Sequence, residues 1–199
     1  MRVVFCWQMM SGYMAACWRA LAAKEGIDLH VIARRPESGS AVEFTSSIMD
    51  GIDSTLLTQA EMDEPDRLTR LVREQKPDVV VLCGWGSPSY PKVASDPALA
   101  SCKFIMTMDT PFSGKLRQRL GGIAKRGYFQ RFDHCVVAGE RTHRLARTLG
   151  FDAAILTRGV YSVDGPTFET AIDQRAQLDQ WPDAFLFVGR YAPGKGIDV

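Results

Sequence analysis

Two basic side chains near the end of the chain have the types and the spacing that could bind a diphosphate. Arg190 follows Gly189 directly after an apolar run, residues 184–188, and Lys195 stands a few positions later beside Gly196. Arg offers a planar fork of N–H donors and Lys a mobile point charge, so the two can converge on one anion. A solvated turn with two surface cations fits the same residues, and spacing alone does not separate the two interpretations.

A second candidate anion site is the turn after the first apolar run, residues 2–7. Ser11 and Gly12 stand where an amphipathic stretch begins at Tyr13. The N-terminus of a helix presents unpaired N–H groups and the positive end of the helix dipole, which suits a phosphate. A plain turn with Ser11 as the N-cap is the alternative, because a single glycine is a weak signal.

Three more residues that follow apolar runs could serve a sugar or its acceptor. Asp109 ends the run 103–108, and a carboxylate there could hold an acceptor hydroxyl or act as a base. Trp85 and Tyr90 follow the run 78–83 and could line an acceptor cleft by stacking on a sugar. The alternatives are that Asp109 only caps a helix and that both aromatic rings only pack.

A basic stretch lies between Gly114 and Arg131, which holds six Lys and Arg residues and no acid. Its apolar residues recur at helical spacing. A basic amphipathic helix suits an anionic membrane surface or an anionic acceptor, although such a run is more often a solvated face. The candidate docking residues are Lys115, Arg117, Arg119, Lys125 and Arg126.

These residues need a scaffold, and the alternation of apolar runs with amphipathic stretches predicts it. The expected strands are residues 2–7, 29–34, 78–83, 103–108, 134–138, 153–157 and 184–188. The expected helices are residues 13–24, 65–75, 90–100, 114–130, 140–149 and 167–180, with a loop and a short strand within 36–53. Strands that are apolar throughout, such as 79–82, favour a parallel sheet that is covered on both faces. The predicted fold class is therefore α/β, a doubly wound, mostly parallel, Rossmann-like sheet with ligands at the carboxyl ends of its strands.

Composition narrows the class of protein further. The chain has 199 residues, a net charge of +1, and 46% apolar residues, which argues against disorder and against a nucleic-acid partner. Five cysteines without a C-x-x-C pair, and three histidines without a partner at metal-ligand spacing, predict reduced thiols and no metal site. No apolar run is long enough for a membrane span. We expect a cytoplasmic protein.

The last segment resembles the start of the donor-binding domain in family 4 glycosyltransferases, which have the GT-B fold. Val188-Gly189-Arg190 and Lys195-Gly196-Ile197-Asp198 carry the resemblance, with Gly194 where the family usually has Glu. The resemblance implies that Arg190 and Lys195 contact the diphosphate of the donor. It also implies an acceptor-side domain over 1–183 and, at 184–199, the truncated start of a nucleotide-sugar-binding domain.

Upstream, the resemblance is looser. Gly12 matches the family's glycine-bearing first turn, which approaches the donor phosphates, and Asp109 stands near the point where family members often carry a His. Arg158 and Tyr161 replace the Asn and Asp of the family's Asn-Gly-Val-Asp type turn.

The expected function is that of a retaining glycosyltransferase that moves a sugar from a nucleotide-diphosphate sugar to a hydroxyl acceptor, carbohydrate or lipid-linked, without cofactor or metal. The fragment alone is expected to be inactive, and peripheral contact with the inner face of an anionic membrane is a further hypothesis. The alternatives are another GT-B enzyme, such as a nucleotide-sugar epimerase, and a non-catalytic GT-B-like binding module.

Overall fold

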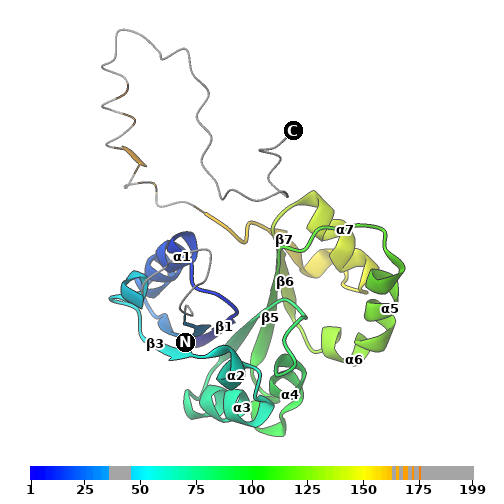
Figure 1. Cartoon of the computed structure of the whole chain (residues 1–199), viewed down its shortest axis with the longest axis horizontal. Helices are drawn as coiled ribbons and strands as arrows, with labels where there is room; N and C mark the ends of the chain where they lie inside the picture. Colours follow the sequence, from blue (N-terminus) through cyan, green and yellow to red (C-terminus); the bar gives the residue numbers. More distant parts are fainter. Residues whose placement is uncertain (36–45, 163–164, 166–167, 170–171, 173–174, 176–199) are drawn as a thin grey trace. The chain divides into compact units, whose positions relative to one another are not determined.

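Figure 1 shows the computed structural model of the chain, which divides into two units, Met1–Asp164 and Gly165–Val199. The structure describes residues 1–35, 46–162, 165, 168, 169, 172 and 175. The expected domain boundary at 183, the strand 184–188 and the expected diphosphate ligands Arg190 and Lys195 lie outside the described residues.

The first unit is built on a seven-stranded sheet in the order β3-β2-β1-β4-β5-β6-β7, and every neighbouring pair is parallel. This confirms the predicted doubly wound, parallel α/β fold. The apolar, β-branched runs form the central strands because both faces of a parallel sheet are buried. The strands are β1 (Arg2–Trp7), β2 (Asp28–Arg34), β3 (Ser54–Leu57), β4 (Val79–Cys83), β5 (Lys103–Met108), β6 (His134–Val137) and β7 (Leu156–Arg158).

Short helices connect the strands. They are α1 (Gly12–Ala22), α2 (Gln59–Met62), α3 (Pro65–Glu74), α4 (Tyr90–Ser95), α5 (Leu116–Ala124), α6 (Arg126–Phe129) and α7 (Glu140–Thr148). The helix expected over 114–130 is two helices, because the backbone of Lys125 leaves the helical region at φ −108° and ψ 20°. The helix expected over 90–100 ends at Ser95, because the carboxylate of Asp96 accepts from the N–H of Ala98 and starts a separate turn at Pro97.

Two strand predictions are displaced in the structure. The strand expected at 153–157 starts only at Leu156, because the carboxylate of Asp152 caps a 3-10 turn over Ala153–Ile155. The short strand expected within 36–53 follows that region instead, as β3, and pairs with β2 at the edge of the sheet. Neither shift changes the order of the elements.

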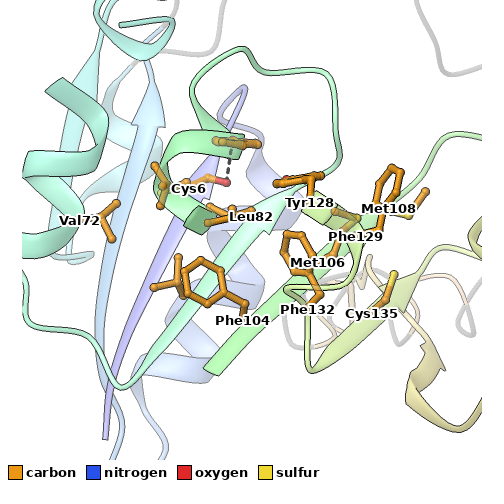
Figure 2. Packing of buried hydrophobic residues seen from close by; sticks show 14 of the residues in the cluster. Cys6, Val72, Leu82, Phe104, Met106, Met108, Tyr128, Phe129, Phe132 and Cys135 are labelled. Carbon is orange, nitrogen blue, oxygen red and sulfur yellow. Dashed lines mark hydrogen bonds between the residues drawn. The ribbon is translucent and has the colours of Figure 1, made fainter. Parts of the chain in front are cut away.

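The core lies on both faces of the sheet because side chains alternate along each strand. On β1, Val4 and Cys6 face the cluster under α2, α3, α4, α6 and α7, whereas Val3 and Trp7 face α1. Figure 2 shows the first cluster, in which Phe104 and Met106 of β5 pack with the aromatic residues that follow α5. No residue of α5 belongs to either cluster of buried apolar side chains.

Candidate functional site

A cavity of about 960 Å³ lies outside the carboxyl ends of β1, β4 and β5, next to the point between β1 and β4 where the sheet reverses its strand order. Parallel α/β sheets bind their ligands in this crevice, outside the carboxyl ends of the strands. Gln8 after β1, residues 83–87 after β4, and Asp109 with Thr110 after β5 form its floor, and α5 forms a wall. Four residues proposed from the sequence, Trp85, Asp109, Arg117 and Lys125, line this one cavity.

Trp85 is held in the cavity wall from two sides. Gly84 turns the chain at φ +71°, a conformation that favours glycine, and its N–H donates to the carbonyl of Thr107 at 2.7 Å. Gly121 of α5 lies against the indole so closely that a Cβ there would stand 2.5 Å from the ring. Lys125 donates to the carbonyl of Trp85 at 2.6 Å, and its ammonium lies 5.5 Å from the ring centroid.

Asp109 is exposed at the end of β5, and its carboxylate has a specific partner. The hydroxyl of Tyr161 donates to Oδ2 of Asp109 at 2.5 Å, and the hydroxyl of Thr142 donates to the Asp109 carbonyl at 3.2 Å. Asp109 does not cap a helix, because the next helix, α5, begins only at Leu116 and has Lys115 at its N-cap. Its carboxylate lines the cavity in a fixed orientation, which suits a group that holds or takes a proton.

Tyr161 is a site residue that the sequence marks only as a departure from a family turn. It lies after β7, and its ring meets that of Tyr13 on α1 edge to face, with centroids 5.1 Å apart. Burial, and then the hydrogen bond to Asp109, raise the pKa of the Tyr161 hydroxyl well above its usual range, so it remains a donor at neutral pH. The signal that could have found it is its place at the carboxyl end of a strand.

The turn before α1 has the features of an anion site. Gly12 begins the helix and is exposed, and a Cβ added to it would meet no atom within 4 Å. Ser11 is buried at the N-cap position, yet its side chain makes no capping bond, and its Oγ has no partner among the described residues. The N–H groups of the first turn therefore remain available to a ligand.

The other predicted site residues lie away from this cavity. Tyr90 does not line the cleft: its ring is fully buried under the sheet, and its hydroxyl donates to the carbonyl of Cys6 at 3.0 Å. This corrects the stacking role expected for Tyr90. Lys115, Arg119 and Arg126 are exposed around α5 and lie outside the cavity lining.

The described residues contain no group of three His, Cys, Asp or Glu side chains that could hold a metal ion. Cys83 lines the cavity, but burial raises the pKa of its thiol to about 12, so it is not a nucleophile at neutral pH. Among the described residues, no helix is long and apolar enough to cross a membrane.

Comparisons with known proteins place the fold but not the family. No family model matches the chain, and no curated protein matches it. Solved structures do match. The UDP-GlcNAc 2-epimerase of Neisseria meningitidis, bound to UDP-GlcNAc, superimposes with a TM-score of 0.58 at 12% identity, over 89% of this chain and 53% of that chain.

Two other matches agree. Another UDP-N-acetylglucosamine 2-epimerase gives a TM-score of 0.56 at 13% identity, over 78% of this chain and 47% of that one. The Staphylococcus aureus MnaA–UDP structure gives 0.56 at 10% identity, over 88% and 51%. This chain thus spans about half the length of these neighbours. At such identities the likeness is one of fold, that of the N-terminal half of a GT-B protein.

Proposed function

We propose that this chain is the N-terminal half of a GT-B enzyme that acts on a nucleotide-diphosphate sugar. The observation that carries the proposal is that two features share the carboxyl edge of the sheet: the cavity with its oriented carboxylate, Asp109, and the exposed N-terminus of α1, which follows β1. The first feature can manage a proton and the second can face a phosphate. A binding module would also use the phosphate site, so the carboxylate is the feature that favours an enzyme.

Each group has a role in this proposal. The sugar lies in the cavity between Trp85 and Asp109, where the indole packs on its apolar face and the carboxylate holds or takes a proton. The first turn of α1, at Gly12, faces the diphosphate, and Lys125 supplies positive charge to the cavity wall. Arg190 and Lys195 stay proposed ligands of the same diphosphate. The enzyme contributes positioning and electrostatic stabilisation of the departing nucleotide.

Two reactions fit this arrangement. Nucleotide-sugar epimerisation has the better support, because two of the similar solved structures are UDP-GlcNAc 2-epimerases. Retaining transfer of the sugar to a hydroxyl acceptor is the second candidate. It is favoured by the Gly-Arg and Lys-Gly elements at 188–198 and by a cavity whose size, about 960 Å³, leaves room for an acceptor beside a sugar.

One experiment separates the two reactions. The full-length protein that contains this chain is incubated with nucleotide-diphosphate sugars, UDP-GlcNAc first, without any acceptor, and the sugar is followed by NMR. An epimerase changes the configuration of a ring carbon under these conditions. A transferase leaves the sugar unchanged and releases the nucleotide only when an acceptor is added.

The variant Asp109→Asn keeps the size of the side chain and removes the charge, and it should suppress either reaction. The absence of both reactions across all donors and acceptors tried would contradict the proposal, as would full activity in the Asp109→Asn protein.

A further inference from the structure

Helix α5 is oriented with its apolar residues outward. Its buried residues are Gln118 and Gly122, whereas Leu116, Leu120 and Ile123 are 67%, 53% and 75% exposed. In an ordinary surface helix the apolar stripe faces the core. The reversed orientation means that packing inside this unit does not explain why these three positions are apolar.

Two contacts fix that orientation. The amide of Gln118 accepts from the N–H of Ser113 at 2.9 Å and donates to the carbonyl of Pro111 at 3.0 Å, which ties the inner face of the helix to the loop before it. Gly122 lies against the end of α7, where a Cβ would stand 3.2 Å from the Cα of Leu149. Gln118 and Gly122 thus fix the inner face of α5 against the rest of the unit. Figure 1 shows the helix at the periphery of the unit, beside α7.

The basic residues lie beside this exposed stripe. With 3.6 residues per turn, Arg117 and Arg119 project roughly 70–90° to either side of the stripe centre. Lys115 precedes the helix and Arg126 follows it, and both are exposed. In the part of the chain that the structure describes, none of these four cations forms an ion pair. Lys125 is not counted with them, because its ammonium donates a hydrogen bond to the Trp85 carbonyl.

We propose that α5 docks on an anionic lipid bilayer, with Leu116, Leu120 and Ile123 in the interface and Lys115, Arg117, Arg119 and Arg126 at the headgroups. Charge complementarity selects this occupant: an exposed apolar stripe bordered on both sides by unpaired cations matches an interface that is apolar below and anionic above. A second copy of this surface would bring like charges together.

The docked helix is also a wall of the cavity, since Leu116 and Leu120 line it while remaining largely exposed. Docking by α5 therefore places the cavity mouth at the membrane surface. A lipid-linked molecule could reach the cavity from there without leaving the bilayer.

The test is cosedimentation of the full 199-residue chain with vesicles of equal parts phosphatidylglycerol and phosphatidylcholine, against vesicles of phosphatidylcholine alone. We expect binding to the anionic vesicles only, and weaker binding at high salt. The double variant R119Q/R126Q should lower the partition coefficient roughly thirtyfold, at about fivefold for each charge. The triple variant L116S/L120S/I123S should lower it at least as much.

The matched control is K24Q/R70Q, which removes two exposed cations from α1's end and α3 and should leave binding unchanged. Circular dichroism checks that each variant is folded. Binding that is equal on both vesicle types, or equal in the α5 variants and the control, overturns the proposal. The proposal is also overturned if the protein does not bind the anionic vesicles but forms a dimer by light scattering, and the L116S/L120S/I123S variant does not.

Discussion

The hydroxyl of Tyr161 donates a hydrogen bond of 2.5 Å to Oδ2 of Asp109, which joins the segment after β7 to the end of β5. The two residues are 52 positions apart in the chain, and the parallel sheet brings them together because β5 and β7 present their carboxyl ends at the same edge. This contact orients the one carboxylate among the described residues that lines the cavity.

Removing the Tyr161 hydroxyl should therefore affect the reaction more than the fold. In the full-length protein we expect Tyr161→Phe to lower kcat/KM about 10- to 150-fold, because a hydrogen bond to a charged group is worth about 1.5–3 kcal/mol. The change should appear in kcat, since the carboxylate loses its donor. Tyr13→Phe is the control, because the Tyr13 ring touches Tyr161 and the substitution leaves that ring contact in place. An equal effect in both variants would mean that the hydrogen bond from Tyr161 to Asp109 is not the cause.

Gly121 should be sensitive to a single methyl group. In Gly121→Ala the new Cβ would stand 2.5 Å from the Trp85 ring, so we expect a loss of about 1–3 kcal/mol in the free energy of unfolding and an altered tryptophan fluorescence. Gly127→Ala in α6, where a Cβ meets nothing within 4 Å, should be neutral or slightly stabilising. Urea denaturation of both proteins measures the difference, and two equal stabilities would refute the close contact.

Gln118 should resist replacement by an apolar residue although it is buried. Gln118→Leu removes the amide that bonds the loop before α5, so that the N–H of Ser113 and the carbonyl of Pro111 lose their hydrogen bonds. Leaving these groups unpaired should cost about 1–3 kcal/mol. Thermal or urea unfolding would show this loss, whereas a more stable Gln118→Leu protein would mean that α5 does not sit as described.

Stability should fall at alkaline pH. Burial raises the pKa of the Tyr128 hydroxyl, and burial followed by the hydrogen bond to Asp109 raises that of Tyr161, both above the value of about 10 in the unfolded chain. Below that pH both states keep the protons and stability is complete. Above it the unfolded chain loses protons that the folded chain keeps, so unfolding is favoured as the pH rises.

Urea denaturation at about pH 9 and pH 11 measures this effect. The Tyr128→Phe protein lacks one of these groups and should lose less stability between the two values than the parent chain does. An identical loss in both proteins would contradict the assignment.

The fold class could be predicted from the sequence because the apolar runs and the amphipathic stretches that define it are local patterns. Short, β-branched runs such as Val79–Cys83 favour buried strands, and strand–helix alternation leaves few topologies for a parallel sheet. Helix ends were less predictable. Asp96 and Asp152 each cap a short 3-10 turn. Such a side-chain hydrogen bond interrupts a helix or delays a strand, but it leaves no trace in the apolar periodicity of the sequence.

The site was predictable by position but not by contact. Trp85 and Asp109 were found because they follow strands. Tyr90 also follows a strand, yet its ring points into the core, where its hydroxyl donates to the Cys6 carbonyl. The apolar periodicity does not predict the direction of this side chain. The exposure of Leu120 was not predictable either, since the apolar stripe of a surface helix is expected to face the core. The contacts of Gln118 orient the helix the other way.

The most direct test of the central claim is the kcat/KM of the full-length Asp109→Asn protein on the nucleotide sugar that the parent enzyme consumes. Asp50→Asn is the matched control, because Asp50 is exposed just before β3, at the opposite edge of the sheet. If the carboxylate at the cavity manages a proton, Asp109→Asn should lose about 10²- to 10⁴-fold while Asp50→Asn stays at the parent value. Parent-level kcat/KM in Asp109→Asn would contradict the account, because the cavity at the β1–β4 switch point would then not be where the reaction takes place.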